Sequence, residues 1–519
     1  MSEYKTKIYT ALSSLSQLKW TLAAKGLLTG AVAGLLAVFY RMGIEYGTET
    51  AIKIYAYFKI HPLFIIPWVL GAGAVGVFVA WLIRLEPMAN GSGIPQVEGV
   101  VLFGMKMKWN TILAVRFLAG FASSFFGLSL GREGPSIQIG AAGGQAIARN
   151  LRKSKLEENY LITGGAAAGL AAAFNAPLSG MVFALEEVHR SFSPLILLSA
   201  TTASLTADFV SKYFFGLQPV LSFTAFPEIP IHLYYWLIPV GLISGLIGSL
   251  INKSLLWFQT LYGKLPDLIR PGIAMLIALP CGMFFPLVLG SGQDLIKFAE
   301  TTTSGISILV VYLVVKLLFT STSFGSGIPG GIFMPILAVG TLSGSIVGIL
   351  ASHVGLPPEY ISDLAVCAMA GALSASVKAP VTSILLTAEM AGSLTHMLPV
   401  AACSFLALLL SDLLHIEPIY EALLERYVEN TDDELPMQKK GGLLELPVEF
   451  GCDVAGKKIS EIEWPNGALI VGVRRGEKEL VPRGDTQIMP GDYLVILSTE
   501  ENETAIRDSV RGLCRNESC

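Results

Sequence analysis

Long apolar runs recur along most of this chain and constrain its fold more than any other feature. They lie at Leu27–Tyr40, Leu63–Ile83, Leu161–Leu185, Trp236–Leu256, Ile273–Leu289, Ile306–Phe319, Ile332–Leu350 and Met397–Leu410. Charged residues make up only 15% of the 519 residues, and the mean hydropathy is +0.60, whereas soluble domains carry about 25% charged residues. The pattern predicts an all-α protein that crosses a membrane several times.

Several of these runs are shorter than the roughly 20 residues that a straight spanning helix needs, and others are cut by glycine or proline. We therefore expect broken and tilted helices. Two copies of Gly-Ser-Gly-Ile-Pro, at Gly91–Pro95 and Gly325–Pro329, end apolar segments in the two halves of the chain. Their places predict paired repeats at about residues 27–215 and 236–420, with a binding site at the interface.

Backbone that leaves a helix at membrane depth must line a cavity inside the protein, because lipid offers it no hydrogen-bond partners. One pentapeptide alone would be interpreted as the end of one helix and the start of the next. Two copies, together with the charged insert Gly131–Pro135, favour a transport path.

Each pentapeptide combines flexible glycines, a serine hydroxyl and a proline suited to the first turn of a helix. The N-terminus of such a helix carries free N–H groups and a partial positive charge, which together bind anions. The predicted substrate is therefore an anion. Gly325–Gly330 also fits the dinucleotide pattern G-x-G-x-x-G, but no strand precedes it and no ribose-binding acid follows at the expected distance, so we reject that interpretation.

The insert Gly131-Arg132-Glu133-Gly134-Pro135 places an ionisable carboxyl group among apolar segments. An acid inside a membrane costs ~2.5 to 3.5 kcal/mol on insertion scales and is a functional candidate by default. A carboxylate at the anion-binding end of a helix competes with the anion for the same amides, and protonation removes that competition. Glu133 is therefore predicted to be both gate and proton acceptor. The alternative is an ion pair with Arg132, but adjacent residues on a helix do not face each other.

Other charged residues within the apolar part are expected to have structural roles. Glu98 and Arg116 are predicted to form a buried pair within the first half. Helix capping or pairing with backbone is expected for Lys316, Lys378, Glu389 and Asp412.

Four motifs resemble, in order, the anion-pathway signatures of the ClC family of chloride channels and proton-coupled chloride transporters: Gly91–Pro95, Gly131–Pro135, Gly330–Pro335 and Tyr420. The stretch Gly164–Pro177 and the Glu186-Glu187 pair are also similar to that family. The resemblance covers nearly all of an expected transmembrane domain at residues 1–427. It implies the ClC fold of two inverted repeats and a homodimer in which each subunit has its own pore.

The resemblance also implies roles for single residues. A central anion site of hydroxyl groups and backbone positions is implied at Ser92, Tyr420, Gly93, Ile332 and Phe333, and an outer site at the amides near Arg132, Glu133 and Gly134. Without the resemblance, Ser92 would be interpreted as a helix cap and Tyr420 as an aromatic residue at the membrane interface. A serine at position 92 is similar to chloride-selective members, and bromide and nitrate stay candidate substrates.

Glu186 and Glu187 end an apolar run, and from the residues alone they would be a solvated helix terminus. In the resemblance, the second acid matches the inner proton-transfer glutamate of the exchangers, where channel members commonly have an uncharged residue. Glu187 therefore favours proton-coupled chloride antiport over the alternative, a passive, gated chloride channel. A shift of one residue in the alignment would exchange the roles of the two acids.

The composition changes after Tyr427. An acidic linker is expected at residues 428–440, followed by a small α+β domain at 441–519 with strand-like alternation and a helix-like end at Glu500–Leu513. Four segments resemble the C-terminal ligand-binding domain of TrkA and related potassium-channel regulators: Ala455–Ile462, Gly467–Arg475, Val481–Thr486 and Met489–Ile496. The resemblance implies a dimerising regulatory module, with cyclic di-AMP or another nucleotide as candidate ligand. The alternative is a tail that only supports dimerisation or stability.

Positive charge before the first span, at Lys5, Lys7, Lys19 and Lys25, predicts a cytoplasmic N-terminus, and Lys439 and Lys440 predict a cytoplasmic C-terminus. The sequence thus predicts a multi-pass protein of a prokaryotic plasma membrane that moves chloride and protons. A membrane-embedded enzyme would need a nucleophile with a base or a metal cluster, which six scattered histidines and six cysteines do not supply, so no metal or cofactor is expected. The net charge of −4 gives no indication of a nucleic-acid partner. A ligand sensor with a vestigial transport fold stays open.

Overall fold

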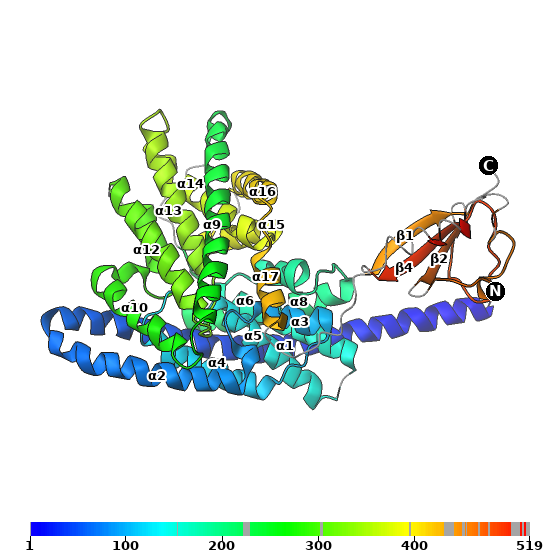
Figure 1. Ribbon diagram of the computed structural model, residues 1–519, viewed down its shortest axis with the longest axis horizontal. Coiled ribbons are helices and arrows are strands. Elements are labelled where there is room, and N and C mark those ends of the chain that lie inside the picture. Colours follow the sequence, from blue (N-terminus) through cyan, green and yellow to red (C-terminus); the bar gives the residue numbers. More distant parts are fainter. Residues whose placement is uncertain are drawn as a thin grey trace. The chain divides into compact units, whose positions relative to one another are not determined.

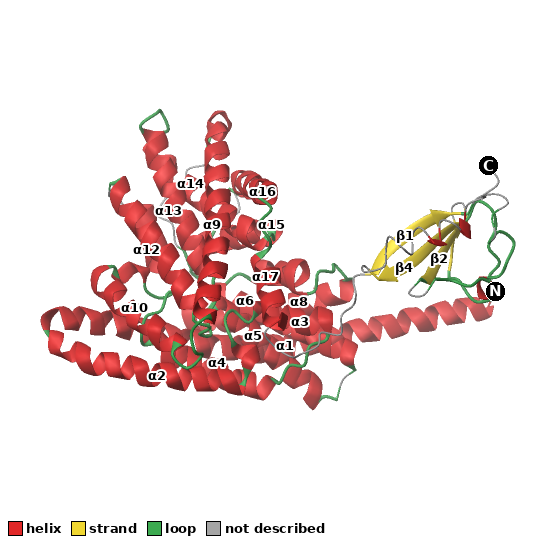
Figure 2. Cartoon of the chain, viewed as in Figure 1, coloured by secondary structure: helices red, strands yellow, loops and turns green. Residues whose placement is uncertain are grey.

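The computed structural model describes residues 2–152, 154–221, 229–301, 305–393, 396–429, 441–448, 452, 454–465, 468–475, 478–499, 509–510 and 513–514. The chain forms two compact units, Met1–Asp433 and Glu434–Cys519. Helices build the first unit, and the strands belong to the second (Figure 2). Most of the expected linker, residues 430–440, lies outside the described residues.

The first half of the helical unit runs from α1 to α8. Its α-helices are α1 (Ser2–Ile60), α2 (Ile65–Leu85), α3 (Ile94–Phe103), α4 (Trp109–Ser124), α5 (Glu133–Asn150), α6 (Lys155–Phe174), α7 (Pro177–Phe183) and α8 (Pro194–Phe215). Short 3-10 turns η1 (Pro62–Phe64) and η2 (Pro87–Ala89) precede α2 and α3, and a π-helical turn η3 (Ala184–Val188) follows α7.

The second half runs from η4 (Ile231–Trp236) to α17 and has a similar order of elements. Its α-helices are α9 (Leu237–Gly263), α10 (Arg270–Phe284), α11 (Gln293–Thr301), α12 (Ile306–Gly325), α13 (Phe333–Ser352), α14 (Ile361–Val377), α15 (Pro380–Ala391), α16 (Met397–Leu413) and α17 (Ile419–Glu429). The 3-10 turn η5 (Pro286–Val288) precedes α11, and η6 (Pro358–Tyr360) precedes α14. In Figure 1, α9 runs steeply across the direction of α1 and α2, so the helices are strongly tilted relative to one another.

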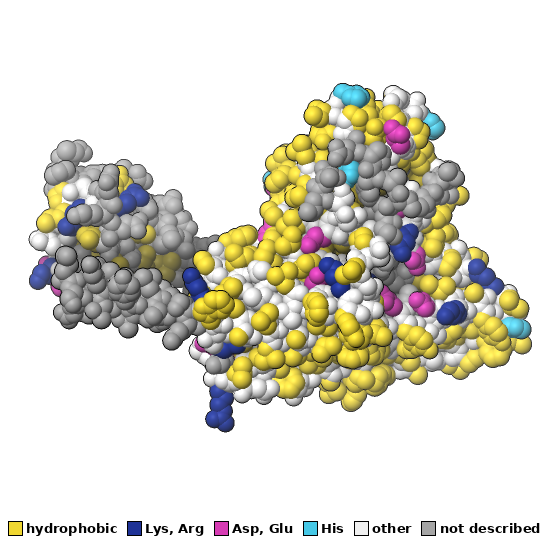
Figure 3. All heavy atoms as spheres, turned by 180° about the vertical axis from the view of Figure 1, so that it is seen from behind, with side chains coloured by type: hydrophobic (Ala, Val, Ile, Leu, Met, Phe, Trp, Pro, Cys, Tyr) yellow, Lys and Arg dark blue, Asp and Glu magenta, His cyan; other side chains and the backbone are white. Residues whose placement is uncertain are grey.

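Seven helices among the described residues are long and apolar enough to cross a membrane. Large apolar side chains such as Leu70, Phe209 and Leu409 are exposed on this unit, and hydrophobic atoms cover most of the face of it seen in Figure 3. Such extended apolar surface suits contact with lipid. Polytopic membrane architecture is therefore confirmed.

Other helices are too short to span, as the interrupted runs predict. Helix α3 has ten residues and α11 nine, so each covers only about half of a hydrocarbon core roughly 30 Å thick. Helix α3 begins inside the protein, where Ile94 and Pro95 are buried, and not in lipid, where its free backbone groups would find no partners. The unit is therefore built of two halves with a similar order of elements and with broken helices.

The two Gly-Ser-Gly-Ile-Pro copies are not equivalent positions of the repeats, which corrects the prediction. Gly91 and Gly93, with φ of +59° and +91°, match Gly290 and Gly292, with φ of +62° and +95°, just before α11. Pro95 lies in the first turn of α3, whereas Pro329 precedes α13 by several residues and starts no helix. The second copy follows α12 and corresponds to the loop after α4.

The interior of this unit is built from small residues that let helices touch through their backbones. A Cβ atom on Gly140 of α5 would lie 2.1 Å from the carbonyl oxygen of Gly165 of α6, and a Cβ on Gly165 would lie equally close to Gly140. No side chain fits there, so the two helices pack at minimal separation, as membrane helices with small residues do. This contact sets the direction in which α5 enters the middle of the protein.

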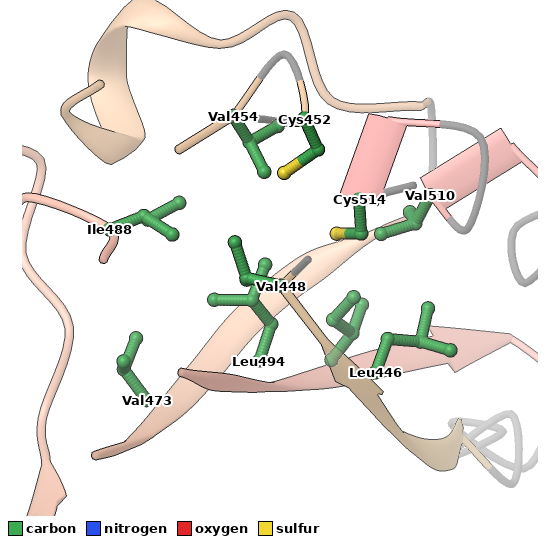
Figure 4. Packing of buried hydrophobic residues seen from close by; sticks show 10 residues of the cluster. Leu446, Val448, Cys452, Val454, Val473, Ile488, Leu494, Val510 and Cys514 are labelled. Atoms are coloured by element: carbon green, nitrogen blue, oxygen red, sulfur yellow. The ribbon is translucent and has the colours of Figure 1, made fainter. Parts of the chain in front are cut away.

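The second unit contains a four-stranded sheet of β1 (Gly441–Pro447), β2 (Leu469–Arg475), β3 (Lys478–Leu480) and β4 (Tyr493–Thr499). Its order is β1-β4-β2-β3, and all three pairings are antiparallel. One face buries Leu446, Val473 and Leu494, against which Val510 and Cys514 pack (Figure 4). Residues 509–510 and 513–514 are helical, and most of the expected C-terminal helix lies outside the described residues.

Candidate functional site

The N-terminal ends of α3, α5 and α13 meet in the middle of the helical unit. Gly131 and Gly331 exchange both backbone hydrogen bonds, N–H to carbonyl, at 2.7 Å each, which brings the first turns of α5 and α13 together. Gly330 N–H donates to the Gly91 carbonyl at 3.0 Å and so adds the loop before α3. Free N–H groups of helix starts thereby converge on one place, which favours negative charge.

Two buried hydroxyl groups, of Ser92 and Tyr420, lie at this place. Ser92 is 2% exposed and Tyr420 is 0% exposed, and neither hydroxyl makes a hydrogen bond to a described residue. Buried polar groups are nearly always paired, so unpaired ones require an explanation. Because Ser92 Oγ caps no helix and Tyr420 is fully enclosed, the helix-cap and membrane-interface interpretations do not fit.

Glycine and phenylalanine residues shape the space around these hydroxyl groups. A Cβ on Gly134 would lie 2.5 Å from Ser92 Oγ, so the first turn of α5 approaches the serine because position 134 has no side chain. Phe333 at the start of α13 stacks on Tyr420 with ring centroids 6.0 Å apart. Ile332 and Phe333 are both buried. The residues predicted for the central site therefore lie together, while their role in binding an anion stays a prediction.

Glu133 lies at the same helix ends and is fully buried. A Cβ on Gly131 would lie 2.1 Å from Glu133 Oε2, so the side chain folds back over the start of α5. The backbone N–H groups of Glu133 itself and of Met334 act on this carboxyl group, but neither oxygen has a hydrogen-bond partner among the described residues. The carboxyl group thus occupies the region where an anion would meet the same amides.

Arg132 is held mainly by a different carboxylate. Its Nη1 binds Glu45 of α1, whereas the distance from Arg132 Nε to Glu133 Oε1 is 4.0 Å. Glu45 also accepts from Arg41 Nε at 3.2 Å. The alternative interpretation of Glu133 as a simple partner of Arg132 therefore has weak geometric support.

Glu186 and Glu187 have different environments. Glu186 accepts hydrogen bonds from Val381 N–H at 3.2 Å and from the N–H and hydroxyl of Thr382 at 2.7 Å each, so it caps α15 in the other half of the chain. Glu187 is 5% exposed, and its Oε1 has no partner among the described residues. A solvated helix terminus is wrong for both acids, and the buried one, Glu187, is the residue predicted for proton transfer.

Glu389 caps α7 in the same way as Glu186 caps α15. Its carboxylate accepts from Leu178 N–H at 3.1 Å, from Ser179 N–H at 2.8 Å and from the Ser179 hydroxyl at 2.5 Å. The capping role predicted for Glu389 is confirmed. Because the two caps are reciprocal, each half of the protein supplies the carboxylate that the other half's helix needs.

The predicted pair of Glu98 and Arg116 does not form. Arg116 Nη1 donates to the Gly91 carbonyl at 2.6 Å and its Nε binds Gln138, because that carbonyl turns towards α4 at a positive-φ glycine. Glu98 is instead paired with Arg190, Nη2 to Oε1, at 2.6 Å. Arg190 was missed by sequence reasoning, although it follows Glu187 by only three residues.

Lys316 pairs with backbone as predicted, whereas the side chains of Lys378 and Asp412 pair with each other. Lys316 Nζ donates to the backbone carbonyls of Val288 and Gly290 at 3.0 Å each. Lys378 lies at the C-terminal end of α14 with φ of +63° and pairs with Asp412 at 2.7 Å.

Two cavities approach the converging helix ends. One, of about 740 Å³, reaches Gly91 and Ser92 and has Arg84, Asp267 and Arg270 in its wall. The other, of about 170 Å³, reaches Arg132 and is lined by Ser291 and Gly292, which are the equivalents of Ser92 and Gly93 in the second repeat. The site therefore lies between two openings that use matching loops of the two halves.

Comparisons with known proteins agree with this architecture. The family model described as "Voltage gated chloride channel" matches residues 75–412, and the TrkA-C domain model matches residues 443–511. The chain is similar to the H(+)/Cl(-) exchange transporter ClcA of Cronobacter sakazakii, with 32% identity over 80% of this chain and 91% of that protein. It is 31% identical to ClcA of Salmonella typhimurium over 78% of this chain and 88% of that protein.

The chain is also similar to solved structures of antiporters. A slow cyanobacterial Cl-/H+ antiporter is 28% identical with a TM-score of 0.74, over 79% of this chain and 98% of that chain. A CLC-type fluoride/proton antiporter, 24% identical with a TM-score of 0.63 over 75% of this chain and 95% of that chain, shares the fold.

Proposed function

Because this chain belongs to the voltage-gated chloride channel family, we infer that it exchanges chloride for protons across a membrane. The observation that carries this function is the meeting of the buried Glu133 carboxyl group with the buried hydroxyl groups of Ser92 and Tyr420 at converging helix ends, none of which has a hydrogen-bond partner among the described residues. An anion and a proton-binding group thereby use the same place. A gated channel would also use such an acid as its gate, so the second buried acid, Glu187, is what favours the exchanger.

The geometry supports a simple gate. When ionised, the Glu133 carboxylate would be favoured by the positive ends of α5 and α13 and would compete with chloride. When protonated, it would lose that attraction and leave the amides and hydroxyl groups to the anion. Ser92, Tyr420 and the amides of Ile332 and Phe333 would then hold the central chloride, with Gly93 and Gly134 leaving room and Arg132 at the outer end.

Glu187 would receive the proton from the other side. Glu187 is buried on the turn η3, whereas its neighbour Glu186 caps α15. A second buried acid beyond the gate is what an exchanger requires, since a proton must be bound somewhere after it leaves Glu133. The passive, gated channel remains the competing function.

Flux measurements in liposomes separate the two functions. Purified protein in vesicles with an outward chloride gradient is expected to drive protons inward against their own gradient. A channel would carry chloride with no proton movement, and a vestigial sensor would carry neither. Wild-type vesicles that move chloride without any proton uptake would overturn the exchange function.

The C-terminal unit is proposed to regulate transport, with its TrkA-C match as the supporting observation. Cyclic di-AMP or another nucleotide is the candidate ligand, and it can act only if it binds active and inactive states with different affinity. A chain that ends after Pro436 is expected to keep exchange but lose any nucleotide response. Equal responses of both chains across a nucleotide panel would leave this unit as structural support.

We further propose a homodimer in a prokaryotic plasma membrane with both termini in the cytoplasm. The lysines before the first span, including Lys19 and Lys25, support the cytoplasmic N-terminus through the positive-inside rule. Cross-linking in native membranes tests the dimer, and accessibility of single introduced cysteines at both ends tests the orientation.

A further inference from the structure

One guanidinium group bridges two carboxylates next to the proposed proton site. Arg190 Nη2 contacts Glu98 Oε1 at 2.6 Å, and Arg190 Nη1 contacts Glu421 Oε1 at 2.5 Å. Arg190 adopts a positive φ of +50°, which is uncommon for a residue other than glycine and indicates that surrounding contacts hold it there. This arrangement is called the Arg190 bridge below.

The three residues of the Arg190 bridge belong to three elements that carry the proposed site. Glu98 is on α3, which begins directly after the loop of Ser92. Glu421 is the neighbour of Tyr420 on α17. Arg190 follows η3, which carries Glu187. Helix α3 packs directly on both α17 and η3.

Electrostatics makes the bridge hard to replace. Glu98 is 1% exposed, and its second oxygen has no hydrogen-bond partner among the described residues. A buried carboxylate is costly unless a counter-charge binds it, and removing one partner of such a pair is more harmful than never having the pair. The forked guanidinium can bind two carboxylates at once in fixed geometry, whereas a lysine ammonium is a compact point charge.

We propose, on the basis of the exchange function above, that Arg190 is a positioning residue that couples the anion site to the proton site. The bridge fixes α3 against α17, and this contact sets the spacing between the hydroxyl groups of Ser92 and Tyr420. Its positive charge also balances Glu98 and Glu421 beside Glu187. Without it, α17 shifts relative to α3, chloride binds less tightly, and chloride leaks past without its proton.

The direct test compares Arg190→Gln and Arg190→Lys with the wild type. Chloride affinity is measured by titration calorimetry, and the ratio of protons to chloride is measured in liposomes. Arg190→Gln is expected to weaken chloride binding about tenfold, about 1.4 kcal/mol, and to lower the proton-to-chloride ratio. Arg190→Lys is expected to recover only part of both losses, because lysine keeps the charge without the fork.

Arg149→Gln is the matched control. Arg149 lies at the C-terminal end of α5 and pairs with Glu158 at 3.4 Å. The substitution therefore removes an arginine–carboxylate pair at the other end of that helix, away from the site. It is expected to leave chloride affinity and coupling unchanged. An equal loss in Arg149→Gln would mean that any lost arginine pair impairs transport, and the proposal would fail.

Glu421→Ala gives a second, milder variant. Glu421 is 41% exposed on its side chain, so its removal leaves Glu98 paired and the fold intact. Glu421→Ala is also expected to weaken chloride binding. The chloride affinity of the double variant with Arg190→Gln is expected to equal that of Arg190→Gln alone, because both substitutions break the same bridge. Additive losses, or normal affinity and coupling in Glu421→Ala and Arg190→Gln, would overturn the inference. Absence of proton uptake by the wild type would instead refute the exchange function.

Discussion

Arg116 and Lys316 occupy equivalent positions in the two halves and hold equivalent carbonyls. Arg116 Nη1 donates to the Gly91 carbonyl at 2.6 Å, and Lys316 Nζ donates to the Gly290 carbonyl at 3.0 Å. Both cations are completely buried. Each therefore fixes a Gly-Ser-Gly loop that precedes a half-length helix, and the loops present Ser92 to one cavity and Ser291 to the other.

The equivalence of these two serines gives a prediction about chloride binding. Ser92→Ala removes a hydroxyl donor at the converging helix ends and is expected to weaken chloride binding about tenfold or more, since a hydrogen bond to a charged group contributes about 1.5 to 3 kcal/mol. Ser291→Ala is the matched control and is expected to have little effect, because Tyr420 and the first turn of α13 lie on the Ser92 side. Titration calorimetry with chloride measures both, and equal effects would remove Ser92 from the anion site.

Replacement of the gate acid separates chloride movement from proton movement. Glu133→Gln keeps the shape of the side chain in its uncharged form, so chloride flux is expected to persist, to lose its pH dependence and to carry no protons. Parallel chloride-electrode and pH recordings on the same liposomes measure this. Continued uphill proton transport by the variant would show that Glu133 is not the proton acceptor.

The two neighbouring acids on η3 are expected to give opposite phenotypes. Glu187→Gln should abolish proton transport while chloride still moves and the protein stays stable. Glu186→Gln should leave proton coupling intact but lower the stability by about 1 kcal/mol, because α15 loses a charged cap.

Glu389→Gln is the matched control for that comparison, because it removes the reciprocal cap on α7. Its thermal unfolding midpoint should fall by a similar amount with no loss of coupling. If Glu186→Gln stops protons and Glu187→Gln does not, the assignment of the two acids is reversed.

In the C-terminal unit, the Arg475–Asp492 pair predicts a pH dependence. Burial alone would raise the pKa of Asp492, but hydrogen bonds from Arg475 and the Met489 N–H, with the Arg475 charge, outweigh it and lower the pKa below its usual value. A lowered native pKa means that the carboxylate stabilises the fold above its unfolded pKa of about 3.9, and that this stability is lost as the pH falls through the native pKa.

Asp492→Asn is therefore expected to destabilise the C-terminal unit at neutral pH. The variant should also lack the further loss of stability that protonation of Asp492 causes in the wild type below about pH 4. Hydrogen–deuterium exchange of the β4 segment in the intact protein measures both effects. Asp485→Asn is a control at an exposed carboxylate of the same unit. Unchanged exchange in Asp492→Asn at neutral pH would show that the pair contributes nothing to this fold.

The apolar runs and the breaks in the sequence predicted a membrane protein of broken helices, and the resemblance to the family predicted which residues lie together at the candidate site. The apolar runs required helices in lipid, and the glycine and proline breaks required helices that end within the protein. Ser92 and Glu133 lie in motifs whose residue chemistry itself points to an anion and a proton, whereas Phe333 and Tyr420 were predicted only from the resemblance to the family. Glycine supplies positive φ, proline starts a helix, and a buried acid is too costly to be there without a use.

Only the tertiary structure decided which distant residues meet. The two identical pentapeptides lie at different positions of the repeat, because the same five residues form two different turns. One leads into α3, and the other follows α12. Glu98 pairs with Arg190 and not with Arg116, because the two cations approach α3 from different elements. Glu186 and Glu187 are adjacent in sequence, yet the first caps a helix of the other half and the second is buried with one oxygen that has no hydrogen-bond partner among the described residues. Such choices depend on how the two repeats assemble and on the direction in which each helix points its side chains, neither of which a local pattern specifies.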